Sequence, residues 1–235
     1  IQQHKEKLEA EKRIKVSKQK AIIDESEELI LNLANLPNNP NIIKILNRRS
    51  LNAAKTMQEL MPVVKGIKKR VQELTSQLKA SEDLADTQNV TEDNFTFPDN
   101  EQQLVAILQC IKKLRAVLKS EQTKGALDAQ TFSTEDQRLA TMQLKINIES
   151  LVKRGTIAFN KEMLGSARQY FEKALQSLLS TTVKNDYVTT RQADVAQHLE
   201  GITDALKHTN AKDAAKKAKS EENELDLLFQ PKKKW

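Results

Sequence analysis

The sequence predicts an all-α protein built from elongated antiparallel helical hairpins, and three observations lead to that prediction. Only 5 Gly and 5 Pro interrupt the 235 residues. Aromatic residues, which are enriched in β-strands, make up only 4% of the chain. Hydrophobic residues account for 38% and charged residues for 30%, a balance that suits long helices with one apolar stripe each better than a thick core.

The first helix is predicted to cover residues 1–36, and its two halves differ. Residues 1–20 contain seven Lys or Arg and three Glu with few apolar side chains, so we expect a charged helical stalk there. Apolar residues then recur at helical spacing as far as Leu36. The Pro- and Asn-rich residues 37–41 end the helix.

The second helix is predicted to begin near residue 41 and to form an antiparallel hairpin with the first. Pro62 interrupts its apolar stripe, which resumes at Val63, so we expect one helix with a kink at the proline. Residues 87–99 are rich in Asp, Asn and Thr and read as a loop. Its two aromatic residues, Phe95 and Phe97, are expected to pack onto the body.

The C-terminal half is predicted to contain four further helices: 100–122, 135–162, 166–182 and 187–208. Asp99 is the expected N-cap of the first of these. Thr134 and Gln137 match a capping box at the start of the second. Gly165 is expected to form the turn into the third.

The element assignments give five predicted regions. They are a charged helical stalk at 1–20, a helical hairpin at 21–86, a loop at 87–99, a helical domain at 100–208 and a basic tail at 209–235, flexible or loosely helical.

Residues 151–179 carry small and aromatic residues at defined positions. Gly155 is followed by Ala167, by Phe171 four residues later and by Ala174 three residues after that. This pattern resembles a tetratricopeptide (TPR) repeat, a helix hairpin that has a glycine in its first helix and the spacing A-x3-F in its second. The resemblance implies a TPR-like C-terminal half in which Phe171 fills the space between two closely packed helices. It also implies that the protein holds partner proteins together.

The tail contains an apolar cluster after a charged run, and we expect it to bind a protein partner through Leu225, Leu227, Leu228, Phe229 and Trp235. Residues 225–229 are similar to the peptide by which bacterial replication and repair proteins dock on the sliding clamp, although Glu224 stands where that motif has Gln. The other explanation is that these side chains fold back onto the helical body.

No catalytic, cofactor-binding or metal-binding residue is predicted. The three histidines, His4, His198 and His208, have no ligand partners at metal-site spacing, and the glycines are isolated. Cys110, the only cysteine, lies among apolar residues at helical spacing and is expected to be buried. The sequence therefore indicates a non-enzymatic scaffold or adaptor that mediates protein–protein interactions.

The net charge of +6 leaves several kinds of partner open. Basic residues in the runs 65–70 and 112–115 are either solvated helix faces or phosphate contacts, so the alternative function is a soluble DNA-associated accessory protein of replication or repair. The Lys excess at 1–20 suits an anionic membrane surface. It also leads us to expect a single membrane-spanning anchor upstream of Ile1, with this module on the cytoplasmic side. The competing explanation places Ile1 inside a longer soluble helix.

Overall fold

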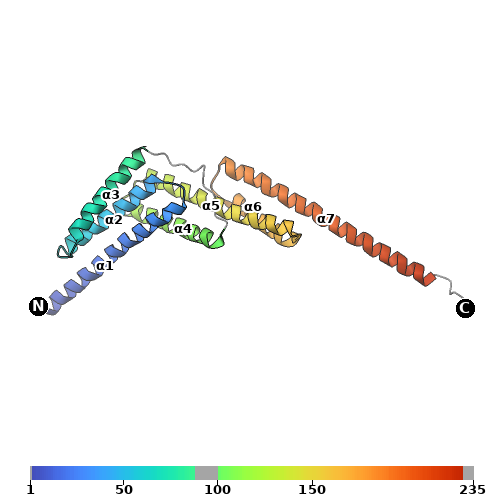
Figure 1. Ribbon diagram of the computed structural model, residues 1–235, viewed down its shortest axis with the longest axis horizontal. Helices are drawn as coiled ribbons and strands as arrows, with labels where there is room; N and C mark the ends of the chain where they lie inside the picture. The colour runs from blue at the N-terminus through green and yellow to red at the C-terminus, as the bar shows by residue number, and fades with distance from the viewer. Residues whose placement is uncertain (1, 88–99, 230–235) are drawn as a thin grey trace. The chain divides into compact units, whose positions relative to one another are not determined.

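The computed structural model describes residues 2–87 and 100–229 and confirms the all-α fold (Figure 1). The described residues contain helices and no strand. In chain order the elements are α1 (Gln2–Asn32), the 3-10 helix η1 (Leu33–Asn35), α2 (Pro40–Leu60), α3 (Ile67–Thr87), α4 (Glu101–Thr123), α5 (Ala129–Asn160), α6 (Leu164–Ser180) and α7 (Asp186–Phe229).

The chain divides into two compact units, residues 1–143 and 144–235. The boundary falls inside α5, so the helix contributes its first half to unit 1 and its second half to unit 2. The segment 100–208, predicted as one domain, is therefore divided between the units. A boundary within a continuous helix leaves no break in helical periodicity, and for that reason the sequence did not indicate it.

Unit 1 is built on α1, α2 and α3, which pack as consecutive antiparallel helices (Figure 1). The prediction of one helix kinked at Pro62 is wrong, because α2 ends at Leu60 and a separate helix begins at Ile67. Proline lacks the N–H that would continue the helix, and Gly66 at φ +84° turns the chain back. The predicted hairpin at 21–86 is thus a three-helix arrangement.

The core of unit 1 explains why α3 folds back instead of extending α2. Its apolar stripe packs on residues of α1 and α2, and the buried cluster consists of Ile23, Leu51, Ala53, Ala54, Met57, Ile67 and Leu74. By contrast, the side chains described within residues 3–20 of α1 are exposed, apart from Val16 and Gln19, which are half-buried. The first part of α1 therefore extends beyond the apolar packing.

A buried arginine joins three helices of unit 1. Arg49 of α2 donates to Oε2 of Glu25 at 2.7 Å and to Oγ of Ser26 at 2.8 Å, both on α1. Its Nε lies 3.4 Å from Oε1 of Glu121 on α4, and the side chains of Arg49 and Glu121 are 9% and 7% exposed. Lys124 also contacts Glu121, at 2.8 Å. The partners lie on different helices, and a shift of one helix along another would leave a buried charge without its partner. The network therefore favours one register of α1, α2 and α4.

Two predicted helix starts are corrected by the caps that the structure contains. At the start of α4 the side chain of Asn100 accepts a hydrogen bond from the Gln102 N–H at 2.9 Å, whereas Asp99 lies outside the described residues. α5 begins before the predicted capping box, since Asp128 accepts from the Thr131 N–H at 2.8 Å. Thr134 therefore lies inside the helix. Asp and Thr are both favoured at the N-cap of a helix, and the chain uses Asp128, which comes before Thr134.

The α5–α6 turn and the end of α7 also differ from the predicted boundaries. Gly165 lies in the first turn of α6, and the left-handed residue of the connection is Glu162 at φ 59°. The backbone of residues 209–229 continues α7, so the region expected as a flexible or loosely helical tail is helical up to Phe229. The first residue of the loop predicted at 87–99, Thr87, still belongs to α3, and the rest of that loop, with Phe95 and Phe97, lies outside the described residues.

Candidate interaction module

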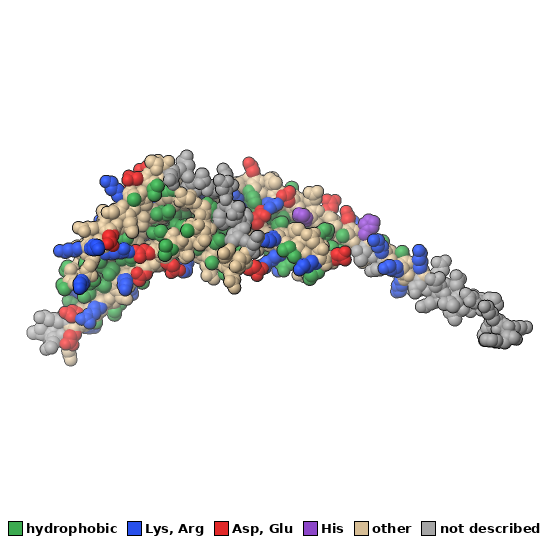
Figure 2. All heavy atoms as spheres, in the orientation of Figure 1, with side chains coloured by type: hydrophobic (Ala, Val, Ile, Leu, Met, Phe, Trp, Pro, Cys, Tyr) green, Lys and Arg blue, Asp and Glu red, His purple; other side chains and the backbone are tan. Residues whose placement is uncertain are grey.

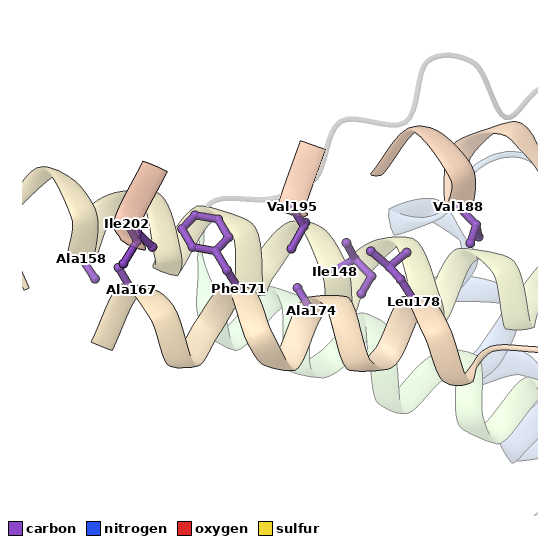
Figure 3. Close-up of a cluster of buried hydrophobic side chains, with 9 residues drawn as sticks. All are labelled: Ile148, Ala158, Ala167, Phe171, Ala174, Leu178, Val188, Val195 and Ile202. Atoms are coloured by element: carbon purple, nitrogen blue, oxygen red, sulfur yellow. The ribbon is translucent and has the colours of Figure 1, made fainter. Parts of the chain in front are cut away.

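Unit 2 packs the second half of α5 against α6 and α7 around one apolar cluster. Figure 3 shows the side chains of α6 directed toward the other two helices. The buried members of this cluster are Ile148 and Ala158 of α5, Ala167, Phe171, Ala174 and Leu178 of α6, and Val188, Val195 and Ile202 of α7. Three of the four residues that the TPR resemblance identified on sequence grounds therefore belong to this cluster.

The fourth of those residues, Gly155, lies directly against the ring of Phe171. A Cβ atom placed on Gly155 would be 2.9 Å from two ring atoms of Phe171, closer than a carbon contact allows. The ring also stacks on the imidazole of His198, with centroids 4.7 Å apart and planes 10° from parallel. Phe171 is 1% exposed and thus contacts both the α5 backbone and an α7 side chain.

The packing of α7 follows a seven-residue spacing. Val188, Val195 and Ile202 are buried, and Leu199 and Leu206 pack beside them. This is the spacing of a helix that presents one apolar seam to its neighbours, as in a coiled coil. The seam ends at Leu206, after which the exposed residues of α7 are mainly Lys and Ala.

A polar cluster joins α5 to α7 beside the apolar seam. Glu149 accepts hydrogen bonds from the Tyr187 hydroxyl and from Nε of Arg191, each at 2.9 Å. The Lys145 ammonium lies 5.4 Å from the centre of the Tyr187 ring. Burial and the neighbouring Glu149 carboxylate raise the pKa of Tyr187, and the hydrogen bonds to Glu149 raise the pKa of Arg191. These groups fix the angle between the two helices, and sequence analysis did not single them out because no spacing rule connects residues 38 apart.

α6 carries a second apolar stripe beside its buried one. Leu175 is half-buried at the edge of the cluster, and Leu179, one turn further along, is 68% exposed. With Glu172, Gln176 and Ser180 they line a shallow depression of about 430 Å³. The sequence holds one signal of this stripe, the Leu178–Leu179 doublet, because adjacent residues of a helix point about 100° apart, which directs the second leucine away from the centre of the buried face.

Comparison with known proteins does not assign the chain to a family. No family model, curated protein or solved structure matches it.

Four of the seven basic residues in the runs proposed as phosphate contacts form ion pairs. Arg70 pairs with Glu27 and Glu73, and Lys69 also reaches Glu73. In the second run Lys113 lies 3.1 Å from Glu28, and Arg115 bonds Asp136 at 2.7 Å. On the face drawn in Figure 2, acidic and basic side chains are interspersed. These pairs reduce the positive charge available to a nucleic-acid backbone.

Three further sequence predictions concern chemistry and membranes. Cys110 is 6% exposed, and burial raises the pKa of its thiol. In the part of the chain that the structure describes, no group of three or more His, Cys, Asp or Glu side chains is arranged to hold a metal ion. None of the described helices has a stretch long and apolar enough to span a bilayer.

The predicted partner-binding tail is only partly described. The backbone of residues 225–229 is helical, but the structure does not describe the side chains of Leu225, Leu227, Leu228 and Phe229. Trp235 lies outside the described residues. Docking through this segment therefore stays a prediction.

Proposed function

We propose that the protein is a non-enzymatic scaffold or adaptor and that unit 2 is its protein-binding module. One observation carries the proposal: α6 buries one apolar stripe in the core, and beside it the half-buried Leu175 and the exposed Leu179 reach the surface. Leucines one turn apart that are not fully covered are typical of sites that receive another helix. The rigid packing around Phe171 supports this role, since a pre-formed helix face binds without the cost of ordering it.

The partner that this stripe suits is an amphipathic helix of another protein. The depression is shallow and almost entirely apolar, which favours side-chain packing over recognition of an extended peptide by hydrogen bonds. Gln176 and Ser180 border the leucines and provide uncharged polar contacts at the rim. A helix with leucine or methionine at every third or fourth position would fill it.

Site-specific photo-crosslinking in cells tests this function. A benzophenone amino acid at position 179 should give one dominant crosslinked protein of discrete mass. The same group at Lys173, which is exposed on the same helix outside the depression, is the matched control. The proposal fails if position 179 gives no discrete product, or if both positions give the same set of products. Leu179→Glu should abolish partner co-purification while leaving the helical circular dichroism unchanged.

We propose in addition that the protein works at the cytoplasmic face of a membrane, with the first part of α1 beside anionic headgroups. Seven Lys or Arg against three Glu within residues 1–20 give this stretch an excess of positive charge, and its described side chains are largely exposed. Each basic residue near such a surface contributes on the order of 1 kcal/mol of attraction, which salt screens.

Vesicle sedimentation tests the membrane proposal separately from the protein-binding one. The protein should sediment with vesicles containing phosphatidylglycerol, not with pure phosphatidylcholine, and added salt should release it. Glutamine at Lys12, Lys15 and Lys18 should weaken this binding, whereas glutamine at the exposed control residues Lys55, Lys68 and Lys79 should not. Equal loss in both triple variants would show that overall charge, rather than the stalk, is responsible.

A further inference from the structure

A pocket of about 270 Å³ lies in unit 1 between α2 and the start of α5. It is outside the protein-binding module and plays no part in the function proposed above. Many of the residues that line it carry hydrogen-bond donors. The lining consists of Asn41, Lys44, Ile45 and Arg48 from α2 together with Leu127, Asp128, Gln130, Thr131, Thr134, Glu135 and Arg138 around the start of α5.

The two carboxylates of the pocket are already engaged by the protein. Glu135 is 1% exposed and accepts hydrogen bonds from the side-chain amides of Asn39 at 2.6 Å and Asn41 at 3.2 Å. Arg138 donates to it at 2.8 Å. Asp128 caps α5 through the Thr131 N–H, and hydrogen bonds from Thr131 lower the pKa of Asp128. The buried charge of Glu135 is thus paired with Arg138, while Asp128 is exposed and its carboxylate is held by Thr131.

The three cations of the pocket retain unused donors. Lys44 is half-buried and forms no ion pair with any residue that the structure describes. Arg48 makes one contact, from Nη2 to Glu82 at 3.0 Å, and Arg138 makes one, from Nη1 to Glu135. Since a guanidinium has five N–H donors, most of the donors on both arginines are free to reach a ligand. Glu135 also holds Arg138 in a fixed orientation.

We propose that this pocket binds the phosphate group of a small organic ligand. Lys44, Arg48 and Arg138 approach from two helices, and a phosphate can accept hydrogen bonds from all three at once. Thr134, whose hydroxyl is a neutral donor, also lines the pocket. Beside these polar groups Ile45 and Leu127 provide an apolar surface, so the ligand is expected to carry an apolar or aromatic portion next to the phosphate.

Calorimetric titration of the full chain with phenyl phosphate tests this site, with sodium acetate at equal ionic strength as the comparison. Phenyl phosphate should bind to the parent protein, and Lys44→Met or Arg48→Met should weaken the binding about tenfold, as expected for loss of one charge-assisted contact. Lys55→Met, on the exposed side of the same helix, removes one positive charge elsewhere and should bind like the parent. Circular dichroism establishes that each variant is folded.

Three outcomes would overturn the proposal. The parent protein shows no binding of phenyl phosphate; acetate binds as tightly as phenyl phosphate; or folded Lys44→Met and Arg48→Met variants both bind as the parent does. Using two variants keeps the test decisive if one of them does not fold. None of these outcomes bears on the crosslinking test at position 179, because the pocket and the leucine stripe belong to different units.

Discussion

Adding a single methyl group at Gly155 tests the packing of the interaction module at its closest point. In Gly155→Ala the new Cβ would lie 2.9 Å from the Phe171 ring, whereas ordinary contacts begin near 3.4 Å, so the ring must move by about 0.5 Å. The ring has little room to do so. It is 1% exposed, lies within the unit 2 cluster and also stacks on the His198 imidazole.

The expected change in the free energy of unfolding for Gly155→Ala follows from two opposing effects. Alanine in a helix interior is favoured over glycine by about 0.8–1 kcal/mol, and overpacking a core costs about 1–3 kcal/mol. We therefore expect Gly155→Ala to lower the free energy of unfolding of unit 2 by about 1 kcal/mol. Gly201→Ala is the matched control, because a Cβ at Gly201 in α7 meets no atom within 4 Å. That variant should raise the free energy of unfolding by about 0.8 kcal/mol. Gly155→Leu should cost about 3 kcal/mol or more.

The two tyrosines allow unit 2 to be followed by itself. Tyr170 and Tyr187 both lie in that unit, so near-ultraviolet circular dichroism of their band, in a Trp235→Phe background, reports its denaturant unfolding. If Gly155→Ala stabilises the unit as much as Gly201→Ala does, the close approach of α5 to Phe171 is wrong. Gly155→Leu unfolding like the parent would lead to the same conclusion.

Three further predictions concern other buried groups. Cys110 should react slowly with a maleimide in the native protein and rapidly in denaturant, because its thiol is buried and its pKa is raised; fast native labelling would contradict the burial. Arg49→Met should lower the free energy of unfolding by about 2–3 kcal/mol because it removes the buried hydrogen bonds to Ser26 and Glu25, while Glu121 keeps Lys124 as its partner. Arg13→Met, in a largely exposed pair, should change it by under about 0.5 kcal/mol. The raised pKa of Tyr187 means that the folded protein holds this proton more tightly than the unfolded chain. Stability should therefore fall as the pH rises above the ordinary tyrosine pKa of 10.0, and Tyr187→Phe should make that fall less steep.

Helix content and much of the core could be predicted from the sequence, because both depend on local properties. Scarcity of Gly, Pro and aromatic residues predicts helices, and apolar residues at 3.6-residue spacing identify the buried face of each. Gly155, Ala167, Phe171 and Ala174 were singled out by their resemblance to a TPR repeat rather than by spacing alone. The structure places Ala167, Phe171 and Ala174 in the unit 2 cluster and Gly155 against the Phe171 ring.

Only the tertiary structure decided how these helices pack together and which of their apolar side chains remain exposed. A proline such as Pro62 is compatible with either a kink or a complete reversal, and the packing of Ile67 and Leu74 back onto α1 and α2 selects the reversal. Ion pairs and hydrogen bonds such as Glu149 with Arg191 join residues 42 apart, a separation that no local pattern encodes. Whether Leu179 is covered depends on what packs against α6, because helical spacing gives the direction of a side chain but not its neighbour.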